Sequence, residues 1–144
     1  MTIDQQREVL DKTYRMLTEF AGKPPRGSVA PWWETSKEGA QLLLDYGIEY
    51  DHSMSHTDCE AYYLRTGDTW TNIDYKKKPE DWMKPLVKGQ DTGLVEIPAN
   101  WLIEHMKKHE GVEFVTMAEI CDEFKKKNPA PAGAVLPAPP GAML

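Results

Sequence analysis

The stretch 50–59 reads YDHSMSHTDC and holds most of the side chains that could do polar chemistry: Asp51, His52, His56, Asp58 and Cys59. Imidazole, carboxylate and thiolate groups bind first-row metals or move protons at neutral pH. One hypothesis is a metal site in which Asp58 joins His52 and His56 as the third ligand. The alternative is a polar, hydrogen-bonded loop that lines a pocket, because the serines between the histidines are poor helix formers.

The elements around this stretch predict a parallel sheet. Residues 27–31 are expected to form a short strand, Thr35 or Ser36 to cap a helix that buries Ala40, Leu43 and Leu44, and residues 48–50 to begin the next strand. A strand–helix–strand order of this kind is typical of parallel pairing. Loops at the carboxyl ends of such strands are where α/β proteins form active sites.

The second half of the chain predicts two more strands and two more helices. Residues 93–98 form a strand that carries Glu96, a helix runs over 100–109, and residues 112–115 form a last strand. Thr116 is expected to cap a final helix in which Cys121 faces the core as a small apolar residue. His105 and His109 share a face of the 100–109 helix, which we interpret as solvated.

The amino-terminal residues predict a long helix over 2–21. Thr2 and Gln5 have the spacing of a capping box, and Gly22 ends the helix ahead of two prolines. An apolar stripe at helical spacing is expected to be buried; its members are Leu10, Tyr14, Leu17 and Ala21, widened by Val9, Thr13, Met16 and Phe20.

Two segments show no helical or alternating pattern of apolar residues. Residues 60–92 mix aromatic side chains with glycine, proline and lysine, and a long irregular excursion in a compact domain is usually functional or a lid. Residues 129–144 are rich in proline and alanine and carry no charge, so we expect a disordered tail. The predicted domain therefore covers residues 1–128.

Composition excludes several classes of protein. A length of 144 residues with 40% hydrophobic content suits one domain, and the net charge of −6 argues against nucleic-acid binding. No stretch is long enough to span a bilayer, and no signal peptide is visible, so we expect no membrane association. Two distant cysteines without a CxxC motif favour a reduced, cytoplasmic setting.

Three segments together carry a family likeness: PPRGSVAPWWETS at 24–36, GIEYDHSMSHTDC at 47–59 and LVEIPANW at 94–101. Over residues 1–128 the chain resembles the polysaccharide deacetylase family, carbohydrate esterase family 4. The branch it is most similar to includes allantoinase-like proteins, cyclic imide hydrolases and a peptidoglycan deacetylase. The resemblance implies an α/β fold, a partial and distorted (β/α) barrel with about four short parallel strands.

The resemblance also implies a function. Family members hydrolyse non-peptide C–N bonds of amides in carbohydrate metabolism with a zinc-type divalent cation, which activates water and polarises the carbonyl. Small-molecule or glycan amides (chitin, peptidoglycan, ureides or cyclic imides) are the implied substrates. Seven residues are carried over as substrate-binding: Pro31, Trp32, Trp33, Asp51, His52, Glu96 and Trp101. Val29 stands where the family commonly has an arginine.

This sequence departs from the family pattern at the catalytic residues and at the residues that would bind the cation. The resemblance implies that the catalytic aspartates and the metal-binding histidine pair would fall before Met1. The chain has no Leu-x-x-His-Pro segment, and we expect a long stretch of the family sequence to be absent at the junction of Trp101 and Leu102. We therefore expect a hydrolase that is impaired or inactive as this fragment and does not bind the cation. The alternative is a non-catalytic fragment that binds a ligand or a partner. A homo-oligomer, or pairing with a full-length homologue, is expected because a cut barrel leaves an open sheet edge.

Overall fold

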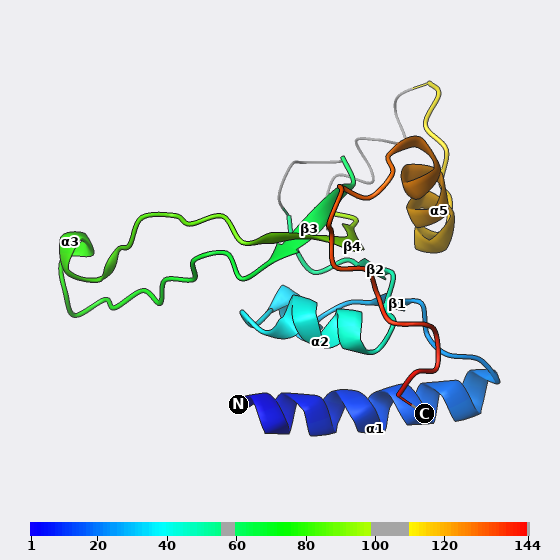
Figure 1. Ribbon diagram of the computed structural model, residues 1–144, viewed down its shortest axis with the longest axis horizontal. Helices are drawn as coiled ribbons and strands as arrows, with labels where there is room; N and C mark the ends of the chain where they lie inside the picture. Colours follow the sequence, from blue (N-terminus) through cyan, green and yellow to red (C-terminus); the bar gives the residue numbers. More distant parts are fainter. Residues whose placement is uncertain (56–59, 99–109, 144) are drawn as a thin grey trace.

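A computed structural model describes residues 1–55, 60–98 and 110–143. Within these ranges four strands form one sheet in the order β1-β2-β4-β3 (Figure 1). The strands β1 (Gly27–Ser28), β2 (Tyr50–Asp51) and β4 (Gln90–Glu96) are parallel, whereas β3 (Tyr62–Thr66) runs antiparallel to β4. The predicted α/β class is confirmed. The prediction of a wholly parallel set is wrong for β3, and the sheet does not close, so the partial barrel stays a prediction.

The strand β3 lies in the segment that the sequence left irregular. Its pairing register shifts between Tyr63 and Arg65, which interrupts the two-residue period that would reveal a strand. Its place in the sheet depends on β4, since the Thr92 hydroxyl donates a hydrogen bond to the Leu64 carbonyl at 2.6 Å. A single helical turn, α3 (Pro79–Trp82), was also not predicted.

The helix α1 (Ile3–Ala21) confirms the predicted amino-terminal helix. Thr2 and Gln5 form the capping box, and Gly22 ends the helix with a left-handed φ of 68°. The prediction of a wide buried face is wrong, because Tyr14 is the one buried residue of α1 and Phe20 is 92% exposed. No described element packs over most of that apolar stripe.

Two local predictions fail. The helix α2 (Gly39–Asp45) begins after Glu38 without a side-chain cap, so neither Thr35 nor Ser36 caps it, and it buries Leu42 and Leu44 rather than Ala40 and Leu43. Residues 112–115 are exposed and form no strand.

The carboxy-terminal helix α5 (Met117–Lys127) agrees with its prediction. Thr116 and Glu119 form a capping box, and Cys121 is fully buried. The predicted helix over 100–109 lies outside the described residues.

The core has two parts because successive side chains of β4 point to opposite faces of the sheet. Leu94 packs with Tyr14, Leu44 and other residues of the α1–α2 side, and Val95 packs with Cys121 of α5. Figure 1 shows α1 and α2 below the sheet and α5 above it. The sheet is therefore covered on both faces, as parallel strands require.

The proline- and alanine-rich segment lies against the sheet in the described residues. The strand β2 pairs with β4 only at Val95 and Glu96, so the first half of β4 has an open edge. Val135 fills it: its N–H donates to the Asp91 carbonyl at 3.0 Å, and its carbonyl accepts from Gly93 at 2.8 Å. The expected disordered tail thus has backbone partners, because an extended chain can satisfy the donors of an open edge. The domain boundary at residue 128 stays a prediction.

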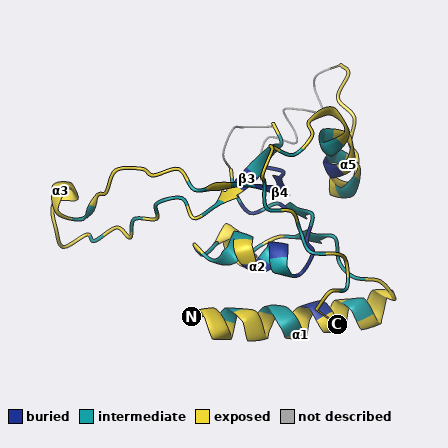
Figure 2. Cartoon of the chain, in the orientation of Figure 1, coloured by how far each residue is buried: buried dark blue, intermediate teal, exposed yellow. Residues whose placement is uncertain are grey.

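Residues 67–89 leave the sheet as a long arm with α3 at its tip (Figure 1). Figure 2 shows that most of this arm is exposed. Among the described helices, none combines the length and apolar character needed to cross a membrane.

Candidate functional site

Two buried acids meet where β2 and β4 end. Asp51 and Glu96 are register partners on these parallel strands, so the pairing places their side chains on the same face at the carboxyl edge of the sheet. Asp51 is 3% exposed and Glu96 is fully buried. Buried carboxyl groups are costly unless they are hydrogen-bonded or protonated, which marks this pair as a candidate site.

The loop after β2 supplies the hydrogen bonds of the pair. One carboxyl oxygen of Glu96, Oε1, accepts from the backbone N–H groups of Ser53 and Met54 at 3.1 and 2.9 Å. The Ser53 hydroxyl donates to Asp51 Oδ1 at 2.9 Å and itself accepts from the Ala30 N–H at 2.9 Å. The second oxygen of Glu96, Oε2, is buried without a hydrogen-bond partner.

Burial sets the protonation of the pair. It raises the pKa of Glu96 to about 8, and the charge of Asp51 adds to this, while the Met54 and Ser53 N–H groups oppose it. Burial also raises the pKa of Asp51, against the hydrogen bond from Ser53. Two adjacent carboxyl groups that resist ionisation hold one proton between them near neutral pH. The proton of Glu96 would lie on Oε2, because Oε1 already accepts two backbone N–H groups.

His52 follows Asp51 and is half-buried. Its Nδ1 lies 2.6 Å from the Ile97 carbonyl oxygen. A carbonyl can only accept, so Nδ1 donates and Nε2 keeps the free lone pair. In this tautomer His52 could ligate a cation through Nε2.

A cleft of about 1090 Å³ opens over this edge of the sheet. Its lining includes Asp51, Ser53 and Met54 with the aromatic side chains of Tyr62 and Trp70. Burial, followed by the charges of Glu96 and Asp51, raises the pKa of Tyr62 to about 12, so its hydroxyl stays protonated. The cleft thus combines an acid, hydroxyl groups and apolar aromatic faces.

The structure brings only some of the predicted site residues to this cleft. Asp51 lines it, Glu96 lies behind Asp51, and His52 adjoins both. Pro31, Trp32 and Trp33 form a short 3-10 turn after β1 and are not among the lining residues, and Trp32 is 88% exposed. Their role in substrate binding stays a prediction. His56, Asp58 and Trp101 lie outside the described residues.

Sequence reasoning missed Ser53, Tyr62 and Trp70. Tyr62 stands opposite Glu96 in the antiparallel pairing of β3 with β4. That pairing joins residues more than thirty positions apart and leaves no signal in the sequence. A serine two positions after Asp51 was the one local clue, and it was interpreted only as a loop former.

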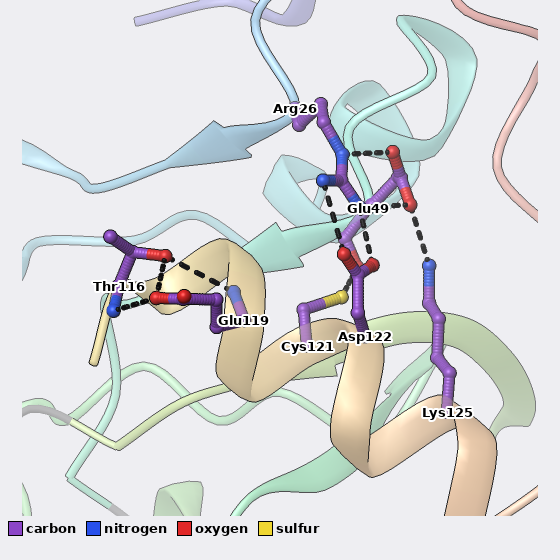
Figure 3. Close-up of polar contacts among 7 residues, drawn as sticks. All are labelled: Arg26, Glu49, Thr116, Glu119, Cys121, Asp122 and Lys125. Atoms are coloured by element: carbon purple, nitrogen blue, oxygen red, sulfur yellow. Dashed lines mark hydrogen bonds and ion pairs between the residues drawn. The ribbon is translucent and has the colours of Figure 1, made fainter. Parts of the chain in front are cut away.

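Within the described ranges, one group of three candidate metal ligands has its ligand atoms within 4.8 Å of one another: Glu49, Cys121 and Asp122. Figure 3 shows that the positively charged side chains of Arg26 and Lys125 contact the carboxylates of this group. Arg26 contacts Glu49 at 2.7 Å and also contacts Asp122, and Lys125 reaches Glu49 at 3.0 Å. The pKa of Glu49 is lowered, chiefly by Arg26, whereas burial raises the pKa of the Cys121 thiol. The cluster is an ion-pair network that holds α5 against β2.

The described residues do not fit a zinc-type cation at the cleft. Asp51, Glu96 and His52 do not bring three ligand atoms together within the ranges searched. A Glu96 that keeps its proton is also a poor ligand, since a cation binds the carboxylate. Of the predicted ligand set His52, His56 and Asp58, the structure describes only His52.

Comparison with known proteins assigns the family. The chain is 35% identical to a peptidoglycan deacetylase of Helicobacter pylori over 195 residues, which cover 90% of this chain and 67% of that protein. It is 38% identical to the peptidoglycan deacetylase-like protein FGM2 of Gibberella zeae over 102 residues, 71% of this chain and 30% of FGM2. The chain belongs to the polysaccharide deacetylase family, as its sequence motifs predicted. No family model matches the sequence.

A crystal structure described as that of a polysaccharide deacetylase, from Mycobacterium smegmatis, is similar with a TM-score of 0.47 and 23% identity. The match covers 92% of this chain and 33% of that one. The sequence identities, rather than this likeness, carry the family assignment.

The two sequence matches differ in one respect. Because 90% of 144 residues is about 130, roughly 65 of the 195 residues matched in the Helicobacter protein have no counterpart here. The 102 residues matched in FGM2 equal 71% of this chain, which leaves no room for such a gap. About 65 residues of the matched span of the relative therefore have no counterpart in this chain. Their predicted position, between Trp101 and Leu102, stays a prediction.

Proposed function

We propose that this chain is a deacetylase-like hydrolase for non-peptide C–N bonds, with the N-acetyl amide of a glycan as its substrate, and that hydrolysis is impaired. The observation that carries the proposal is the buried pair of Asp51 and Glu96 at the cleft of a chain whose relatives are named peptidoglycan deacetylases. Hydrolysis of an amide needs a base for water and an acid for the leaving nitrogen.

The two acids have different parts in this proposal. Asp51 lines the cleft, so its carboxylate is the group that could take a proton from an attacking water. Glu96 does not line the cleft. It holds the Ser53–Met54 backbone in place and keeps a proton beside Asp51, so it is a positioning residue.

We expect hydrolysis to be impaired because the described residues at the cleft offer little to stabilise charge on the amide carbonyl oxygen. Charge that develops on the carbonyl oxygen must be stabilised for the reaction to be fast, and loss of one such contact costs about 10²–10³ in rate. The described residues offer no ligand set for a cation at the cleft, and Tyr62, whose raised pKa keeps its phenol protonated, is one neutral polar group in the lining. We therefore expect slow acetate release.

Sugar binding in this proposal rests on Trp70 and Tyr62. The indole and phenol faces can stack on the apolar face of a pyranose ring, and Trp70 is half-exposed at the rim. Binding of an N-acetylglucosamine tetramer should quench tryptophan fluorescence. Trp70→Ala should weaken tetramer binding about tenfold, or about 1.4 kcal/mol. Trp32→Ala is the control, because Trp32 is exposed outside the cleft lining.

Acetate release from the same tetramer tests the chemistry. The wild-type chain should release acetate slowly, and Asp51→Asn should abolish the release while tetramer binding remains. Binding with no acetate above background would leave the non-catalytic alternative and refute the hydrolase. Rapid turnover would refute the impairment, and absence of binding would refute the substrate class.

A further inference from the structure

The arm formed by residues 67–89 exposes apolar side chains that its own chain does not cover. Ile73 is 56% exposed, Tyr75 90%, Met83 62% and Val87 64%. None of these four lines the cleft. Several large apolar side chains exposed on one segment can mark an interaction site.

Polar groups of the arm also lack partners. At its base Thr69 and Val87 exchange hydrogen bonds of 3.0 and 2.8 Å, but within the described residues no backbone bond joins the two limbs between there and α3. At the tip, the indole N–H of Trp82 is buried without an acceptor. A buried donor without a partner costs about 1–3 kcal/mol, so an added carbonyl would stabilise the tip.

Charge indicates which partner the arm fits. Residues 67–89 contain five lysines and four acids, a net charge of +1, so the rest of the chain carries −7. Lys76, Lys78 and Lys84 form no ion pair within the described part of the chain. The arm therefore carries a net charge opposite in sign to that of the body of another copy of this same chain.

The body also offers a surface for the arm. On α1, Val9, Met16 and Phe20 are 56, 61 and 92% exposed. Their spacing of seven and four places them on one face of the helix. This stripe was expected to be buried, and none of the described elements covers it.

We propose that two copies of this chain form a two-fold dimer in which the arm of each packs on the α1 stripe of the other. A two-fold arrangement uses the same two surfaces twice and leaves neither of them uncovered. The lysines of the arm then lie against the acidic body, and both apolar surfaces leave water together. The inference does not depend on the chemistry of the cleft.

Sedimentation velocity of the full chain at micromolar concentrations tests the proposal. The wild-type chain should be a dimer that weakens with added salt. The triple variant Ile73→Ser/Tyr75→Ser/Met83→Ser should raise the dissociation constant at least about tenfold. Trp32→Ser removes an equally exposed aromatic side chain outside the arm and should leave the dimer unchanged. Circular dichroism melts would verify that each variant is folded.

Cross-linking tests the surface to which the arm binds. A photoreactive amino acid in place of Tyr75 should form intermolecular adducts with peptides from residues 3–21, and the substitution Phe20→Ser should reduce their yield. A wild-type monomer, a dimer that survives the triple variant, or adducts confined to other segments would overturn the proposal.

Discussion

Replacing Glu96 by glutamine should remove most of the pH dependence of stability. In the unfolded chain this carboxyl has its ordinary pKa of 4.5, whereas in the native state the pKa is raised to about 8. Between these values the native state binds more protons than the unfolded state, so the free energy of unfolding falls as pH rises. The stabilisation is complete below about pH 4.5 and is lost as pH passes 8.

The expected size follows from the shift. Each pKa unit is about 1.4 kcal/mol, so the wild-type free energy of unfolding should fall by about 3 to 4 kcal/mol between pH 5 and pH 8. A glutamine side chain is neutral at every pH. Its oxygen can still accept from the Ser53 and Met54 N–H groups, and its neutral NH₂ group takes the place of the protonated oxygen.

Urea unfolding at pH 5, 6, 7 and 8 is the measurement, with the midpoint and slope fitted at each pH. Glu96→Gln should at least halve the fall seen in the wild type, and the exposed Glu113→Gln should not change it. A wild-type stability that rises or stays level over this range would refute the reasoning. So would an equal slope in Glu96→Gln, because the titration would then belong to another group.

Three further outcomes are expected. Arg26→Gln should lower the free energy of unfolding by about 1 kcal/mol in dilute buffer, and by less in molar salt, because the pairing with Glu49 is partly exposed and screened; equal losses in both buffers would contradict this. Thr116→Ala should cost about 1 kcal/mol by removing the cap of α5, measurable as a lower urea midpoint, and Thr116→Ser should recover most of it. Gly47→Ala should cost about 1–3 kcal/mol, since φ is +73° and the added Cβ would lie 2.7 Å from the Ala138 carbonyl oxygen; an unchanged melting temperature would show that residues near Ala138 do not pack there in solution.

The sequence determined features that depend on near neighbours. The capping box at Thr2, the cap at Thr116 and the helix stop at Gly22 depend only on residues within a few positions of one another, so local patterns predicted them. Three separated motifs also predicted the family. The acids Asp51 and Glu96 were candidates because the family resemblance carried both over as substrate-binding residues, and Asp51 also belongs to the polar cluster at 50–59.

Tertiary structure decided what distant segments do to one another. Pairing of β3 with β4 brought Tyr62 to the acids, and the loop after β2 closed on Glu96 through two backbone N–H groups, which no spacing in the sequence encodes. The apolar stripe of α1 was correct as a helix face but wrong as a buried one. Periodicity reports which residues share a face, whereas burial depends on whether another segment covers that face.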